Sequence, residues 1–223
     1  MSDLTLLIPA KFEAECLPYF LKELQKFNYK KVVILDSKDL KTIEAVKKFN
    51  DVEILFQKKN GYGNALIEGI NHTNTNFFSI INADGSMNPS ELEDMMRNIT
   101  SKNYDLVFGS RYMKNAGSED DDFTTKVGNF IFSSLGKVFF KLKISDILYT
   151  FIVGKTSVAK NLKLVSGDFR FCIELPIKTH RQNYNYLSHP CYERKRIAGK
   201  KKVRPFIDGF KILLGMISLF IKL

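Results

Sequence analysis

Oxygen-bearing side chains follow a hydrophobic run near residue 80 and offer the chemistry of a divalent-cation site. The run 77–81 ends in the sequence Asn-Ala-Asp-Gly-Ser at 82–86. Asn82, Asp84 and Ser86 present oxygens at alternate positions, and Mg²⁺ or Mn²⁺ prefers oxygen ligands that it shares with a bound diphosphate. An Asx turn, in which Asp84 bonds only the local backbone, is the alternative interpretation.

Other hydrophobic runs are followed by groups that suit a nucleotide or a sugar. Pro9 and Glu13 follow the first run, although a carboxylate there also suits the start of a helix. Asp36 follows the second run, where it either contacts a base or ribose or caps the next helix. Gly61 and Gly63 open a helix, so the backbone can approach a phosphate or sugar where a side chain would block it.

The chain is basic, with 34 Lys and Arg against 24 Asp and Glu and a net charge of +10. Much of this excess lies in the segment 194–204, which predicts that an anionic partner meets the C-terminal third. Arg111, Arg194, Lys200 and Lys202 are the candidates for binding an acceptor phosphate, because arginine clamps phosphate bidentately. No recognised nucleic-acid-reading motif accompanies the charge, so nucleic acid is not expected as a partner.

The alternation of hydrophobic runs and helical patterns predicts the elements that position these groups. Because strands alternate with helices, we expect an α/β fold with a mostly parallel sheet, whose ligands bind beyond the carboxyl ends of the strands. The acidic stretch 114–122 is expected to be a mobile loop that can act as a lid. Strands are predicted at 4–8, 32–35, 52–56, 77–81, 105–108 and 148–153, and helices at 13–27, 40–49, 64–72, 89–99 and 124–142.

The length of 223 residues suits one catalytic domain at 1–203, followed by an apolar C-terminal segment at 204–223. Three cysteines without a C-x-x-C pair indicate neither a zinc site nor a disulfide framework. The first residues show no secretory leader, so we expect the protein in the cytoplasm.

The segment 206–223 predicts an amphipathic helix rather than a membrane span, which needs roughly 20 mostly apolar residues. Two arrangements remain open. Either the helix lies on the anionic cytoplasmic face of a membrane, beside the basic segment, or it packs on the domain or on a second copy of the chain. In helical geometry the polar residues would form one narrow stripe, made of Asp208, Lys211, Gly215, Ser218 and Lys222.

In their order along the chain, these motifs resemble the family-two glycosyltransferases of the GT-A fold, particularly the dolichyl-phosphate mannosyltransferase-like branch. Asp146 takes the place of the aspartate in the family's D-x-x-S-G-F, and Asp36 lies in a shortened form of its D-D-G-S-T-D. Phe12 stands where the family has asparagine. The other similarities are to P-A-x-N-E-A-x-x-L-P at 9–18, G-x-G-x-A at 61–65, D-A-D-G-S at 82–86, G-S-R-Y at 109–112 and E-x-x-R-x-x-G-x-x-K-V at 193–203.

The resemblance implies transfer of a hexose, with inversion, from a UDP- or GDP-linked donor to a polyprenyl phosphate, assisted by Mg²⁺ or Mn²⁺. It implies that Asp84, with Asn82 and Ser86, binds the metal, and that Asp84, Arg111 and Asp146 are catalytic. Nucleotide-sugar contacts are implied for Pro9, Glu13, Asp36, Gly61, Gly63 and Asn82.

Three other functions would account for parts of the same sequence. Transfer to a hydroxyl of a surface glycan or glycolipid needs a general base, and the sequence shows no clear one. A non-catalytic nucleotide-sugar-binding scaffold is suggested by Asn82, which carries no charge. Sugar-phosphate nucleotidyl transfer is disfavoured, because no glycine-rich loop follows the first run.

Overall fold

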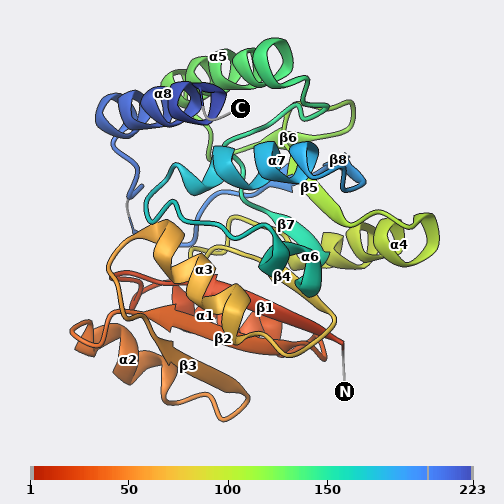
Figure 1. Cartoon of the computed structure of the whole chain (residues 1–223). Coiled ribbons are helices and arrows are strands. Elements are labelled where there is room, and N and C mark those ends of the chain that lie inside the picture. Colours follow the sequence, from red (N-terminus) through yellow and green to blue (C-terminus); the bar gives the residue numbers. More distant parts are fainter. Residues whose placement is uncertain (1–2, 200, 222–223) are drawn as a thin grey trace.

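The computed structural model describes residues 3–199 and 201–221, and its centre is a seven-stranded sheet (Figure 1). The strand order is β3-β2-β1-β4-β7-β5-β8, and only β7 runs antiparallel to its neighbours β4 and β5. The prediction of a mostly parallel α/β sheet is therefore confirmed. The strands are β1 (Leu4–Pro9), β2 (Lys30–Leu35), β3 (Val52–Phe56), β4 (Phe77–Ile80), β5 (Leu106–Ser110), β7 (Ile152–Lys155) and β8 (Tyr186–Pro190).

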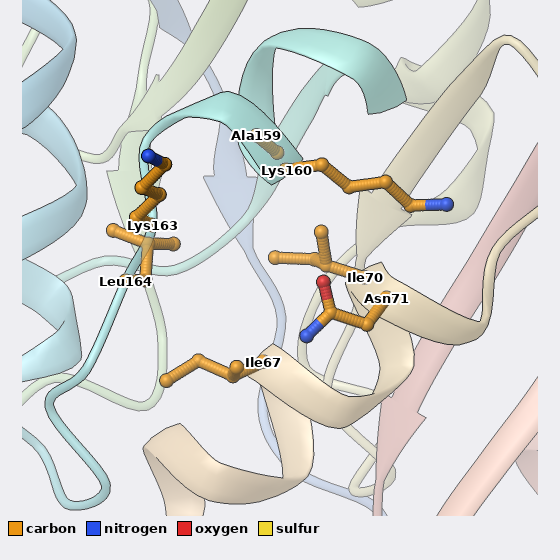
Figure 2. Close-up of a pocket in the computed structure, with 7 residues that line it drawn as sticks. All are labelled: Ile67, Ile70, Asn71, Ala159, Lys160, Lys163 and Leu164. Atoms are coloured by element: carbon orange, nitrogen blue, oxygen red, sulfur yellow. The ribbon is translucent and has the colours of Figure 1, made fainter.

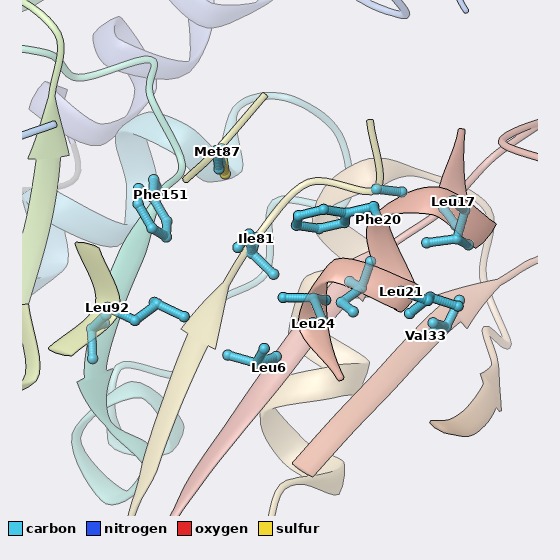
Figure 3. Packing of buried hydrophobic residues seen from close by; sticks show 14 of the residues in the cluster. Leu6, Leu17, Phe20, Leu21, Leu24, Val33, Ile81, Met87, Leu92 and Phe151 are labelled. Atoms are coloured by element: carbon cyan, nitrogen blue, oxygen red, sulfur yellow. The ribbon is translucent and has the colours of Figure 1, made fainter. Parts of the chain in front are cut away.

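Helices cover both faces of the sheet because successive strand residues point to opposite sides. Leu6 faces one core, which Figure 3 shows packed against Phe20, Leu21 and Leu24, whereas Leu7 faces the other core. The first core is covered by α1 (Leu17–Leu24), α2 (Leu40–Val46) and α4 (Leu92–Lys102). Helix α4 continues a 3₁₀ turn at Pro89–Glu91. The second core is covered by α3 (Tyr62–His72), α6 (Thr156–Asn161) and α7 (Phe171–Arg181).

Two further helices, α5 (Phe123–Phe140) and α8 (Pro205–Ile221), lie side by side at one end of the molecule, beyond α7 (Figure 1). Ile212 and Met216 of α8 join Phe140 of α5 and Ile173 of α7 in a third apolar cluster. The C-terminal helix is thus packed on the rest of the chain along one face. Among the described residues, no helix is long and apolar enough to cross a membrane.

A two-stranded sheet joins the acidic stretch to the basic segment. It pairs β6 (Gly117–Ser118) with β9 (Tyr192–Glu193), although the two strands are more than 70 residues apart in the sequence. The backbone N–H of Glu119 also donates to the carbonyl of Glu193 at 2.9 Å. The loop expected to be free is therefore fastened to the segment that carries much of the excess positive charge.

Some predicted boundaries differ from the structure. The helix expected from residue 13 begins at Leu17, because Phe12 has a left-handed backbone (φ 55°) and residues 14–16 form a turn. The strand expected at 148–153 begins at Ile152, since the preceding residues are an irregular loop. The helix expected at 89–99 starts as the 3₁₀ turn and continues to Lys102.

Candidate active site

The predicted metal turn lies at the carboxyl end of β4, directly beneath the basic segment. The N–H of Ile197 donates to the carbonyl of Asp84 at 2.9 Å, and the N–H of Arg194 donates to the carbonyl of Ser86 at 2.8 Å. Gly85 has a φ of 75°, and a Cβ there would lie 2.5 Å from the Cδ1 of Ile197. Glycine is therefore required where the two segments meet.

Asp84 makes the Asx turn that was the alternative interpretation of its sequence position, and it also faces an arginine that the sequence did not indicate. Its Oδ1 accepts hydrogen bonds from the N–H and the hydroxyl of Ser86 at 3.1 and 2.9 Å, which is an Asx turn. Its Oδ2 lies 3.5 Å from Nη1 of Arg196, and 13% of the side chain is exposed. The carboxylate therefore closes the turn with one oxygen and faces a cationic group with the other.

The donor set at this turn fits a magnesium or manganese ion that shares its coordination with a substrate. The Oδ1 of Asn82 accepts a single hydrogen bond, a long one of 3.3 Å from the hydroxyl of Tyr62, so a lone pair remains available. Residues 3–199 and 201–221 contain no cluster of three or more His, Cys, Asp or Glu side chains that suits a metal. Mg²⁺ commonly needs only one or two carboxylates when phosphates complete its shell.

Acidic and basic side chains pair across the top of this turn. Asp120 accepts two hydrogen bonds from Nε and Nη2 of Arg196, at 3.0 and 2.7 Å, and this pairing raises the pKa of the guanidinium. Asp122 accepts from Nζ of Lys201 at 2.7 Å, and that bond, with the N–H of Thr125, lowers the pKa of Asp122 to about 2. The acidic stretch thus neutralises part of the basic segment in this state.

Glu13 lies beneath the same segment. Its Oε1 is 3.4 Å from Nζ of Lys202, and its Oε2 accepts a hydrogen bond from the thiol of Cys16 at 2.9 Å. Burial, together with Glu13, raises the pKa of Cys16 to about 12, so the thiol stays protonated as the donor. Glu13, Asp84, Arg196 and Lys202 therefore gather at one place, whereas Lys200 lies outside the described residues.

Arg111 and Asp146 form a second, buried group. Asp146 accepts from Nε and Nη2 of Arg111 at 2.7 and 3.0 Å, and also from its backbone N–H at 3.1 Å. Nη1 of Arg111 donates to Glu193 at 3.1 Å, and the exposed fractions of the Arg111 and Asp146 side chains are only 6% and 0%. In this arrangement the guanidinium is satisfied by protein carboxylates, so the phosphate-binding and catalytic roles of this pair stay predictions.

Gly61 and Gly63 are packed against another part of the chain. A Cβ on Gly61 would lie 2.2 Å from the carbonyl oxygen of Gly167, and a Cβ on Gly63 would lie 2.0 Å from that of Ser166. Glu174, which is buried, holds this neighbouring loop by accepting from the N–H groups of Val165 and Ser166. Close approach of the protein backbone thus requires these glycines, whether or not a phosphate also binds here.

The ends of β1 and β2 are joined by Asp39 rather than by Asp36. Asp39 is buried, accepts from the N–H of Phe12 at 2.7 Å and caps α2 through the N–H of Thr42. Asp36 accepts from the N–H of Lys38, and Pro9 ends β1. Phe12 is 69% exposed beside this junction, although its left-handed backbone is uncommon for a bulky residue.

Arg194, which was predicted to bind phosphate, connects α1 to the predicted metal turn through hydrogen bonds. Its guanidinium donates to both oxygens of Glu23 at 2.8 and 3.1 Å and to the carbonyl of Gly85 at 2.8 Å. Sequence reasoning did not select Arg196, Asp120, Asp39 or Phe12. The acidic stretch 114–122 and the basic segment 194–204 were the signal that could have indicated the Asp120–Arg196 pair.

Two hollows lie away from this site. A cavity of about 50 Å³ is lined by Ile67, Ile70 and Lys160 among others. Figure 2 shows these side chains between α3 and α6. A space of that size holds water but no nucleotide sugar. A wider hollow of about 590 Å³ lies along the edge strand β8, beside Tyr104 and Tyr186. Neither is lined by Asp84 or by the basic segment.

The chain matches a known protein family and several known proteins. The model of Glycosyl transferase family 2 matches residues 5–163 of the chain. An uncharacterized glycosyltransferase of Mycobacterium tuberculosis is 23% identical over 205 residues, which cover 92% of this chain and 91% of that protein. An uncharacterized protein of Methanocaldococcus jannaschii is 27% identical over 132 residues, 57% of this chain and only about half (54%) of that protein.

Solved structures share the fold. Glucosyl-3-phosphoglycerate synthase from Mycobacterium tuberculosis, in complex with Mn²⁺, uridine diphosphate and phosphoglyceric acid, has a TM-score of 0.71 at 13% identity, over 97% of this chain and 78% of that one. Its complex with Mn²⁺, UDP-glucose and phosphoglyceric acid gives a TM-score of 0.72, at 13% identity, over 97% and 79% of the two chains. At this identity the likeness establishes the fold alone.

Proposed function

Because this chain belongs to glycosyl transferase family 2, we propose that it moves a hexose from a UDP- or GDP-linked donor to a polyprenyl phosphate. A phosphate oxygen of the acceptor forms a bond to the anomeric carbon, while the bond from that carbon to the donor diphosphate breaks. The nucleoside diphosphate departs with the electron pair, and attack from the opposite side inverts the configuration. Stabilising the departing charge is the main task of such a site.

The observation that carries the proposal is the meeting of Asp84 with Arg196 at the carboxyl end of β4. Two of the guanidinium nitrogens bond Asp120, whereas Nη1 points toward Asp84 at 3.5 Å. Nη1 is therefore the donor left for a diphosphate oxygen. Lys202, beside Glu13 and 36% exposed, supplies a second positive charge to the same place.

A divalent ion would be held by Asp84, with Asn82 and Ser86 as neutral oxygen donors. When bound together with the donor diphosphate, Mg²⁺ or Mn²⁺ supplies positive charge that stabilises the departing group. The solved structures of the synthase from Mycobacterium tuberculosis, which hold Mn²⁺ with UDP or UDP-glucose, support this choice of cofactor.

Phe12 is proposed to carry the nucleotide base. Its ring is exposed at the carboxyl end of β1, and Asp39 holds its backbone N–H. Stacking of a base on an aromatic ring contributes about 1–3 kcal/mol. Phe12→Ala should therefore weaken donor binding at least about fivefold. Phe130→Ala is the matched control, since Phe130 is 72% exposed on α5, and donor affinity should be unchanged by it.

The buried carboxylates favour an acceptor that is already ionised. A hydroxyl acceptor needs a general base, but Asp146 bonds Arg111 and Glu174 bonds two backbone N–H groups and Lys178. A phosphate oxygen needs no base, and this observation supports the dolichyl-phosphate mannosyltransferase-like branch. Phosphoglyceric acid in the related solved structures shows that phosphorylated compounds bind to proteins of this fold.

Transfer to a hydroxyl of a glycan or glycolipid is the second candidate, and Asp168 is the observation in its favour. Its side chain is 31% exposed. Burial raises its pKa, but hydrogen bonds from the side chain and N–H of Arg170 outweigh that effect, so the net pKa lies below its ordinary value. Asp168 is therefore ionised at neutral pH, as a base must be, although a low pKa makes it a weak one.

The test offers each UDP- and GDP-hexose with Mn²⁺ to a polyprenyl phosphate, and to the polyprenol of the same length. Efficient transfer to the phosphate, with none to the alcohol, is expected. Asp84→Ala should abolish transfer, whereas Asp94→Ala, at an exposed position of α4, should leave it unchanged. Transfer to the polyprenol or to a glycolipid, with none to the lipid phosphate, would reject this acceptor and support the hydroxyl alternative.

A further inference from the structure

The helices α5 and α8 form a paired layer whose inner side belongs to the core. Phe220 of α8 packs edge-on against Phe139 and Phe140 of α5, with ring centres 5.7 and 6.0 Å apart. Gly215 of α8 packs on Arg170 at the start of α7. The two helices are thus held firmly, side by side, at one end of the molecule (Figure 1).

The outer side of this layer is apolar as well. Phe130 and Val138 of α5 are 72% and 71% exposed. At about 100° per residue, Val138 lies opposite the buried residues of that helix, and Phe130 lies about a quarter turn from them. A large exposed apolar patch on a folded domain marks a site of interaction with a protein or a membrane. The exposed apolar side chains, here called the apolar platform, are Phe123, Val127, Phe130, Ile131, Val138 and Phe139 of α5 and Phe206, Ile207, Phe210, Leu213, Leu214, Ile217, Phe220 and Ile221 of α8.

The exposed charged residues within α5 and α8 are lysines, and the exposed carboxylate next to them, Asp122 at the N-cap of α5, is paired with Lys201. The exposed lysines Lys126, Lys137 and Lys211 flank it, and α5 contains no acidic residue. The acidic residue of α8, Asp208, is 5% exposed and accepts from the N–H of Arg204 at 2.7 Å. A two-fold contact with a second copy would bring these lysines toward one another, whereas an anionic surface complements them.

We propose that the apolar platform is a docking surface for a bilayer that contains anionic lipids. Its phenyl and aliphatic side chains enter the headgroup region while the flanking lysines meet lipid phosphates. The sequence indicated such a role for the last helix alone, and the structure adds α5 as an equal partner. The docking surface is argued independently of the proposed function. Only its purpose, which is to bring the enzyme to a lipid acceptor, rests on that function.

The relation of the apolar platform to the candidate active site suits this use. The basic segment that lies over Asp84 leads into α8. Figure 1 shows the connecting chain that enters this helix. Lys201 and Lys202, just before α8, pair with Asp122 and Glu13. A membrane-bound α8 therefore places the lipid surface one short segment from the groups that face the donor diphosphate.

The test is sedimentation of the full chain with vesicles of phosphatidylcholine and phosphatidylglycerol, against vesicles of phosphatidylcholine alone. Binding to the anionic vesicles only is expected. The double variant Phe130→Ser with Val138→Ser should bind at least about tenfold more weakly, because two exposed apolar side chains no longer enter the lipid. Lys137→Gln should bind about fivefold more weakly. The matched controls on α2, Leu40→Ser and Lys41→Gln, should bind as the unmodified chain does.

Two measurements keep this proposal separate from the proposed function. Transfer to a short-chain polyprenyl phosphate in detergent should be unchanged in the double variant, and circular dichroism should show an unchanged melting temperature. Failure of the unmodified chain to bind anionic vesicles would overturn the docking surface while leaving transfer in detergent intact. A dimer in solution that the double variant dissociates, without any loss of vesicle binding, would identify a second copy as the occupant instead. Vesicle binding combined with transfer to alcohols only would retain the docking surface and reject the phosphate acceptor.

Discussion

Replacing Arg111 by glutamine should destabilise the whole protein, because Arg111 joins two buried carboxylates. Its guanidinium lies 2.7 Å from Asp146 and 3.1 Å from Glu193, and the exposed fractions of the three side chains are 6%, 0% and 9%. Removing one partner of such a pair leaves an uncompensated buried charge and costs about 3–5 kcal/mol. For a chain of this length, that loss lowers the melting temperature by about 6–20 °C.

Arg97→Gln is the matched control for this variant. Arg97 pairs with Glu93 and Asp94 on the surface of α4, where more than half of each side chain is exposed. Exposed pairs of this kind contribute about 0–1 kcal/mol, so the melting temperature should change by no more than about 4 °C. Urea and thermal unfolding, followed by circular dichroism, measure both variants under the same conditions.

The same pair of variants decides between two roles for Arg111. A guanidinium that waits at an open position for an acceptor phosphate would be dispensable for folding. In that case Arg111→Gln would keep the melting temperature of Arg97→Gln and lose only the transfer of sugar. Equal stability of the two variants would therefore refute the structural role argued from burial and from the three hydrogen-bonded contacts with Asp146.

Three other predictions concern glycine packing, pH and metal affinity. Gly63→Ala should lower the free energy of unfolding in urea by about 1–3 kcal/mol, because its Cβ would meet the Ser166 carbonyl. Gly128 has open space around it, so Gly128→Ala should instead stabilise α5 by up to about 1 kcal/mol. The pKa of Asp122 is 3.8 in the unfolded chain and about 2 in the folded protein. Its contribution to the free energy of unfolding is therefore complete above about pH 4 and is lost as the pH falls toward 2. The unfolding free energy of Asp122→Asn, measured at several pH values, should lack that dependence. Asn82→Asp should tighten Mn²⁺ binding, measured by titration calorimetry, because it adds a carboxylate beside Asp84; unchanged or weaker affinity would argue against residue 82 as a ligand.

The local pattern of apolar and polar residues was sufficient to predict most of the fold. Strands with alternate residues directed into two cores read as continuous apolar runs, so β1 and β3 were located to within a residue of their ends. The order of strands and helices also implied a mostly parallel sheet, because parallel strands need crossover helices. The predicted start of α1 was wrong, since Phe12 has a left-handed backbone and its N–H bonds Asp39, which follows a different strand.

The composition of the candidate site was less predictable than its location. The turn at Asn82 to Ser86 follows β4 as its sequence indicated, and the carboxyl end of the sheet is where such turns collect. The pairing of Asp120 with Arg196, however, joins residues that are 76 positions apart. Complementary charge made that contact plausible, but the short β6–β9 sheet, which is a tertiary contact, is what brings the two segments together.

The sequence alone was enough to predict a basic C-terminal third and an amphipathic last helix, because each of these is a property of a single continuous segment. The nucleotide-sugar fold was implied by the resemblance of the ordered motifs to a known family. Which side chains are free to meet a ligand is a property of several segments at once. Arg111 was assigned to a phosphate and is enclosed by Asp146 and Glu193, and Gly61 and Gly63 were assigned to a ligand and are pressed against residues 166–168. The outward apolar face of α5 likewise emerged only from folding, since a helix becomes half exposed or fully buried according to what packs beside it.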